Sequence, residues 1–153
     1  MKTKHIILIL AILSITITAC NKEKRYSKRL IKGEKWAVKD ITVAGTSINT
    51  FGVWNVLQDV KIYETVPQVL WMADTSNAIF EWQFQQKGAI FQLNYNYDSL
   101  ECDNLTLTHL DYLSYDITGT YNVQQHKRKV MEFTSSQTIK YTGQEVKITI
   151  EKQ

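Results

Sequence analysis

The sequence has 153 residues, of which 18 are lysine or arginine, 15 are aspartate or glutamate and 44% are hydrophobic. This length and composition suit one globular domain with a real core. Lys2 and Lys4 belong to a segment that we expect to be removed, which leaves 16 basic side chains against 15 acidic ones. This near neutrality argues against nucleic-acid binding.

The N-terminus has the pattern of a secretion signal. A basic start, Met1-Lys-Thr-Lys-His5, precedes an apolar run from Ile6 to Leu13, and small and polar residues then lead to Cys20. The apolar run is too short to span a bilayer stably, which argues against the alternative of an uncleaved membrane helix. We therefore expect residues 1–19 to be a signal peptide that is removed.

The end of this segment, Ile17-Thr-Ala-Cys20, resembles the bacterial lipobox. The resemblance implies that Cys20 takes a diacylglyceryl group, becomes the first residue of the mature chain and is usually acylated on its amine as well. Two or three acyl chains, at roughly 0.8 kcal/mol per buried CH2, attach a protein to a membrane permanently. We expect a lipid-anchored protein of the cell envelope, in the outer membrane, with the periplasmic or surface side left open.

Residues 20–33 are polar and basic, and we interpret them as a lipidated tether with a short helical turn around Tyr26 to Ile31. Their acidic residue is Glu23, and their basic residues are Lys22, Lys24, Arg25, Lys28, Arg29 and Lys32. A solvated linker is the simpler interpretation. In the alternative, the cations rest on anionic lipid at about 1 kcal/mol each.

The domain over residues 34–153 alternates with a period of two. Phe80, Trp82 and Phe84 alternate with polar neighbours, and after Gln85-Gln-Lys-Gly88 the pattern resumes at Phe91 and Leu93, which predicts a hairpin. A second hairpin is predicted over 118–133 with a basic turn at 126–129, followed by a strand over 146–150. Further strands are expected at 36–43, 53–63, 69–73 and 105–110.

These short strands predict an all-β fold. No window of 12 or more residues has a convincing helical stripe. Locally linked strands favour an antiparallel up-and-down β-barrel of about eight strands, because closure removes exposed edges. An open sandwich is the main rival architecture.

Three short motifs are distinctive: Leu30-Ile-Lys-Gly-Glu-Lys-Trp36 before the first strand, Phe80-Glu-Trp-Gln-Phe-Gln-Gln-Lys-Gly88 with Phe91, and Gly119-Thr-Tyr-Asn-Val123. They resemble motifs of lipocalin-like, calycin-type lipoproteins of Bacteroidota. The likeness covers residues 30 to 150 and implies an up-and-down barrel. In lipocalins a Gly-x-Trp places the tryptophan across the closed end of the barrel. Here the spacing is Gly33-x-x-Trp36, one residue longer, and no clear Thr-Asp-Tyr motif is present, which favours a relative of the barrel superfamily over a true lipocalin.

Reactive chemistry has little support in the sequence. The mature chain offers His109 and His126 but no spacing typical of a zinc site, and we expect no metal, no cofactor and no enzymatic activity. His109 falls on one face of the expected strand with Leu105 and Leu107, as a satisfied or lumen-edge histidine. The acidic neighbours of Cys102 would raise the pKa of its thiol. Asp98, Glu101 and Asp103 lack the order of a calcium loop, so we interpret them as a solvated turn.

The remaining candidate site is the aromatic interior. Small barrels either fill their interior with side chains or leave room for a small ligand. The candidate lining residues are Trp82, Phe84, Phe91, Leu93 and Tyr95. Two hypotheses follow: a barrel that binds a small apolar ligand or an envelope component, and a protein-interaction module with a filled core, such as an inhibitor, immunity protein or assembly accessory. Either would have the membrane as a partner through its N-terminal lipid.

Overall fold

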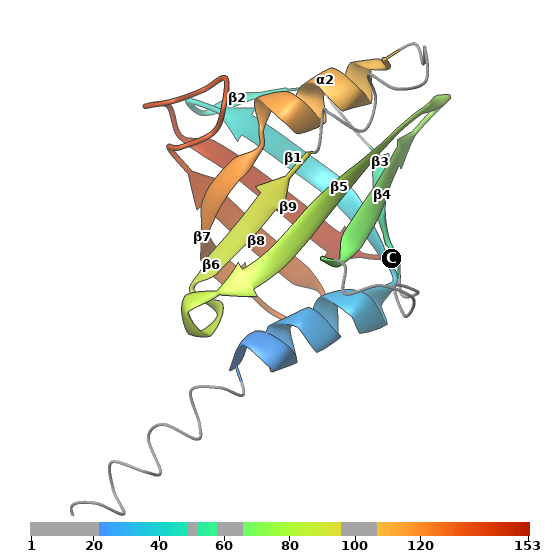
Figure 1. The fold of residues 1–153 in the computed structure, drawn as a ribbon, viewed down its shortest axis with the longest axis vertical. Helices are drawn as coiled ribbons and strands as arrows, with labels where there is room; N and C mark the ends of the chain where they lie inside the picture. Colours follow the sequence, from blue (N-terminus) through green and yellow to red (C-terminus); the bar gives the residue numbers. More distant parts are fainter. Residues whose placement is uncertain (1–21, 49–51, 58–65, 96–106) are drawn as a thin grey trace, which may run out of the picture.

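A computed structural model describes residues 22–48, 52–57, 66–95 and 107–153 of the chain. These residues form a closed antiparallel β-barrel of eight strands, which confirms the predicted fold class (Figure 1). The strands are β1 (Lys35–Val43), β2 (Thr46–Ser47), β3 (Gly52–Val56), β4 (Gln68–Ala73), β5 (Ser76–Gln85), β6 (Ile90–Asn94), β7 (Gly119–His126), β8 (Val130–Ser135) and β9 (Val146–Lys152).

Each long strand pairs with the next long strand along the chain, and β1 closes the barrel by pairing with β9. The two-residue strand β2 pairs with the end of β1, on the edge where β3 pairs with its beginning, and is not one of the eight strands of the barrel. Closure leaves no long unpaired strand edge in the described barrel, which removes the usual template for edge-to-edge aggregation.

The hairpin predicted around residues 80–95 is confirmed. Trp82 lies opposite Leu93 and Phe84 opposite Phe91 in the pairing of β5 with β6. The connection is a short 3-10 turn, η1 (Gln86–Gly88), with Gly88 at φ 80°. Alternate residues of β5 point inward and are buried, whereas Ile79 and Gln83 point outward. The second hairpin and the last strand are also present, as β7, β8 and β9.

The strand predicted over 105–110 is wrong in the part that the structure describes. His109 and Leu110 begin an α-helix, α2 (His109–Asp116), which crosses one end of the barrel (Figure 1). A capping box fixes its start: the Thr108 side chain accepts from the Asp111 backbone N–H, and Asp111 accepts from the Thr108 backbone N–H. These two hydrogen bonds satisfy orphan donors of the first turn, so helix prevails over a short alternating pattern.

The segment interpreted as a tether is also different. Residues 22–33 are helical and lie across the opposite end of the barrel, shown in blue in Figure 1. We call this segment the N-terminal helix. Leu30 has no exposed surface, and Tyr26 and Ile31 pack against the core. The helix is therefore part of the folded domain, because one of its faces is apolar and covers the open barrel end.

Candidate functional site

The five predicted lining residues come together on the inner face of β5 and β6. Their exposed fractions are 7% or less: 1% for Trp82, 7% for Phe84, 0% for Phe91, 1% for Leu93 and 5% for Tyr95. Phe84 contacts Phe91 with ring centroids 5.2 Å apart, and Trp82 lies 5.9 Å from Phe84. Trp82, Phe84 and Phe91 thus form one aromatic cluster, and Leu93 and Tyr95 belong to the same buried core.

This cluster extends across the interior to other strands. Trp54 on β3 stacks on Phe91 of β6 with centroids 6.5 Å apart, although β4 and β5 separate these strands in the sheet. Phe91 also stacks on Phe133 of β8 at 4.3 Å. Trp54 and Phe133 have no exposed surface, so they border no space large enough for water. Side chains bridge the barrel at this level.

Three buried indoles in this interior lack a hydrogen-bond acceptor within the described part of the chain. The Nε1 atoms of Trp54, Trp71 and Trp82 are all buried donors. Trp36 differs, because its Nε1 donates to the carbonyl oxygen of Leu30 at 2.9 Å. A buried donor without an acceptor costs about 1–3 kcal/mol, so these three groups are an unusual feature of an otherwise apolar core.

The α2 end of the barrel is closed by apolar and polar contacts. Leu110, Leu113 and Ile117 are buried over the interior. The hydroxyl of Tyr95 donates to Asp111 Oδ1 at 2.8 Å, which connects the predicted cluster to the helix cap. The Tyr121 hydroxyl donates to the Ile117 carbonyl, and burial raises the pKa of Tyr121.

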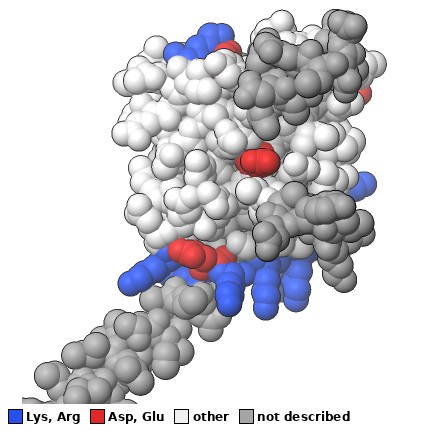
Figure 2. Space-filling view, in the orientation of Figure 1, with Lys and Arg blue, Asp and Glu red and all other residues white. Residues whose placement is uncertain are grey.

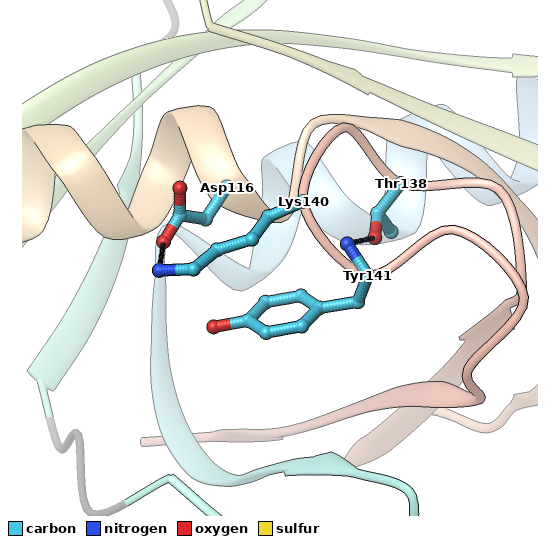
Figure 3. Close-up of polar contacts among 4 residues, drawn as sticks. All are labelled: Asp116, Thr138, Lys140 and Tyr141. Carbon is cyan, nitrogen blue, oxygen red and sulfur yellow. Dashed lines mark hydrogen bonds and ion pairs between the residues drawn. The ribbon is translucent and has the colours of Figure 1, made fainter.

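The loop before β9 is attached to the same end. Lys140 Nζ donates to Asp116 Oδ2 at 2.6 Å, and the backbone N–H of Tyr141 donates to Thr138 Oγ1 at 3.2 Å (Figure 3). The hydrogen bond to Asp116 raises the pKa of Lys140. Because the lysine side of the ion pair is exposed to solvent, we expect the pair to hold the loop beside α2 and to contribute little to stability.

The N-terminal helix closes the other end through Tyr26 and Arg29. The Tyr26 ring stacks on the imidazole of His126 at 3.7 Å and meets the edge of Phe84 at 5.7 Å. Arg29 Nη1 donates to His126 Nδ1 at 3.0 Å and also to the carbonyl of His126. Burial, with the nearby charge of Arg29, lowers the pKa of His126 to about 4. The imidazole is therefore neutral near pH 7.

Exposed cations gather at this end of the barrel. The N-terminal helix, the β5–β6 turn and the β7–β8 turn all contribute, and Figure 2 shows their side chains projecting from the lower end of the molecule. We call this surface the basic end. Its exposed residues are Lys22, Lys24, Arg25, Lys28, Lys32, Lys87, Lys127, Arg128 and Lys129.

Of the other sequence candidates, the structure describes His109 but not the two cysteines or the acidic turn. His109 is exposed at the first turn of α2, which corrects the expectation of a histidine sharing a strand face at the lumen edge. Cys20, Asp98, Glu101, Cys102 and Asp103 lie outside the described residues, as do 58–63 of the strand expected over 53–63. Within the described ranges, no group of three or more histidine, cysteine or acidic residues could hold a metal ion.

Sequence reasoning missed the contacts of the N-terminal helix. The signal was present: Tyr26, Leu30 and Gly33 are spaced by four and three residues, which places them on one face of a helix. Gly33 is part of the same contact, because an added Cβ would lie 2.2 Å from Nε1 of Trp36. The spacing Gly33-x-x-Trp36 thus lets the helix end lie directly on the indole.

Comparisons of the chain with protein-family models, with curated proteins and with solved structures find no match. Among the described helices, none combines the length and the apolar character needed to cross a bilayer.

Proposed function

We propose that the mature chain is a non-enzymatic, lipid-anchored protein of the cell envelope, attached through Cys20, whose lipocalin-like barrel is a filled scaffold that acts through its outer surface. The observation that carries the filled scaffold is the stack of Trp54 on Phe91 across the interior, extended to Phe133. Sites for drug-sized ligands need about 300 Å3 or more, whereas these rings occupy the middle of the barrel.

The outer face of β4, β5 and β6 is the candidate contact surface for an envelope protein. It is largely uncharged in Figure 2, and the outward residues Met72 and Ile79 are 37% and 49% exposed. On the same face, Glu81 follows Ile79 along β5 and accepts from Asn94, and beyond it Gln83 and Gln85 both donate to Gln92, at 2.9 and 2.7 Å. A surface of apolar and amide groups with few charges is easily desolvated, as the centre of a protein interface must be.

Photocrosslinking tests this contact surface. A photoreactive residue at Ile79 is expected to give one specific adduct in intact envelopes, and the same residue at Lys39, an exposed position on β1, is the matched control. Adducts equal in kind and yield at both positions would count against the proposed face. Mass spectrometry of the mature protein tests the anchor, since a Cys20→Ser change is expected to abolish lipid attachment.

A second candidate function is carriage of a ligand that bears a hydrogen-bond acceptor. It is favoured by the unpartnered indole N–H groups of Trp54, Trp71 and Trp82, which a carbonyl or carboxylate oxygen would satisfy. Trp54 and Trp71 have no exposed surface, so such a ligand requires the interior to rearrange. Native mass spectrometry of protein purified from envelopes separates the candidates: a bound small molecule supports carriage, and the bare mass supports the filled scaffold.

A further inference from the structure

The basic end gathers cations from parts of the chain that are far apart in sequence. The N-terminal helix carries Lys22 to Lys32, while Lys127, Arg128 and Lys129 come from the β7–β8 turn. Arg29 joins the two segments through its hydrogen bonds to His126. The fold, and not a single basic stretch, therefore builds this surface.

The surface lies close to the expected anchor. Cys20 precedes Lys22, the first described residue of the helix, by two positions. Two fully extended residues span at most about 7 Å. Because the helix is packed on the barrel, little chain is left to hold the domain away from a lipid attached to Cys20. This distance is comparable to the Debye length of about 8 Å at physiological ionic strength, so charges there interact with the bilayer surface.

Cations outnumber acids at the basic end, although Glu23 and the exposed Glu34 also lie there. The mature chain is nearly neutral overall, so the excess of cations at the basic end is balanced elsewhere. At the α2 end Asp74 and Glu145 are exposed acids, and the exposed Lys140 is paired with Asp116. A molecule with this polarity is aligned by a negatively charged plane, with its basic end toward that plane.

We propose that the basic end is a docking surface for anionic phospholipid headgroups and holds the barrel end-on against the bilayer. The orientation rests on the proposed lipid attachment at Cys20, but the affinity for anionic lipid does not. Each basic side chain that reaches an anionic surface raises partitioning about fivefold. The opposite end and the sparsely charged face of β4 to β6 then point away from the bilayer, toward a partner in the envelope.

The orientation can be measured on the lipidated mature protein in vesicles. In a Cys102→Ser background, a fluorophore is placed at Gln153→Cys, near the basic end, or at Gln144→Cys, near the α2 end; both residues are exposed. Energy transfer to a headgroup-labelled lipid is expected to be stronger from position 153 in vesicles that contain phosphatidylglycerol. High salt, or vesicles of phosphatidylcholine alone, should reduce this difference. Equal transfer from both positions in the anionic vesicles would overturn end-on docking.

A matched pair of variants tests the charges themselves. Lys127→Gln/Arg128→Gln/Lys129→Gln removes three cations from the turn, more than a hundred residues after Cys20, and leaves the sequence beside the anchor intact. Partitioning of residues 20–153 with Cys20→Ser, a form with no thiol for the lipid, onto phosphatidylglycerol vesicles is expected to fall about a hundredfold, at roughly fivefold per residue. Lys39→Gln/Lys140→Gln/Lys147→Gln removes the same charge from other surfaces and should have a much smaller effect. Equal losses in the two variants would overturn the proposal.

Lipid attachment at Cys20 and headgroup binding by the basic end can fail independently. If mass spectrometry finds no lipid on Cys20, the proposed attachment is wrong, and the partitioning measurement still decides whether the basic end binds anionic headgroups.

Discussion

The ring of Tyr26 lies parallel to the imidazole of His126, with centroids 3.7 Å apart and planes 5° from parallel. The contact joins the N-terminal helix to the last residue of β7. Gly88 makes room for it, because an added Cβ there would lie 2.7 Å from Tyr26 Cδ2. This stack is the centre of the helix's attachment to the barrel.

Replacing Tyr26 with alanine is expected to release the helix. The change removes the stack on His126 and the edge contact with Phe84, and for a half-buried aromatic we expect a loss of about 2 kcal/mol in the free energy of unfolding. Urea denaturation measures the loss, and hydrogen exchange should show faster exchange over residues 22–33. Tyr26→Phe keeps the ring and serves as the control. Equal exchange in the two variants would contradict a pinning role.

His126 is expected to make stability depend on pH. Burial lowers its pKa in the folded protein to about 4, against an ordinary value of 6.5 in the unfolded chain. Between these values the unfolded chain binds more protons, so the free energy of unfolding falls as pH decreases from 6.5 to 4. Well above pH 6.5 the imidazole is neutral in both states, and His126 no longer makes the free energy of unfolding change with pH. Because part of the ring is exposed, we expect a change on the order of 1–2 kcal/mol.

The contribution of His126 is isolated by comparison with His126→Phe. Phenylalanine keeps a ring against Tyr26 but does not titrate, and it loses the hydrogen bond from Arg29 to Nδ1. Denaturation curves at a series of pH values should therefore differ in slope between the two proteins from pH 4 to 6.5. Parallel curves over that range would show that the lowered pKa does not contribute to stability.

Gly33→Ala is expected to destabilise the domain through overpacking. The new methyl group would lie within 2.5 Å of three atoms of the Trp36 indole, which itself has no exposed surface. Overpacking of this kind typically costs about 1–3 kcal/mol. Ser27→Ala in the same helix is the matched control and should be neutral or slightly stabilising, because alanine favours helix. Thermal unfolding of both variants, followed by tryptophan fluorescence, checks the difference.

The barrel could be predicted from the sequence because its strands carry a period of two that one buried face requires. This period did not predict the two helices that cover the ends of the barrel. Residues 105–110 alternate like a strand, but the capping box of Thr108 with Asp111 begins a helix of eight residues there, too short to show a periodic stripe. Basic residues obscured the apolar face of Tyr26, Leu30 and Gly33 in the N-terminal helix.

The contents of the barrel interior could be predicted only in part. Alternation predicted that Trp82, Phe84, Phe91 and Leu93 share a face, and they do. Whether such a face lines a cavity depends on what reaches it from strands elsewhere in the sheet. The contacts of Phe91 with Trp54 and Phe133 join strands that are not neighbours, and no local pattern encodes them.

Truncation of Phe91 tests the filled interior most directly. Its ring contacts Trp54, Trp82, Phe84 and Phe133, so Phe91→Ala should cost about 3–5 kcal/mol and leave an apolar cavity. Such cavities stay dry and bind small apolar molecules, so benzene should raise the melting temperature of the variant and leave the parent protein unchanged. Phe91→Leu provides a smaller cavity if the alanine variant does not fold.

Ile79→Ala is the control for Phe91→Ala. It truncates a side chain that is 49% exposed and should change the free energy of unfolding by less than about 0.5 kcal/mol. If benzene stabilised the parent protein as much as the variant, the interior would already hold an accessible cavity, and ligand carriage would become the stronger candidate.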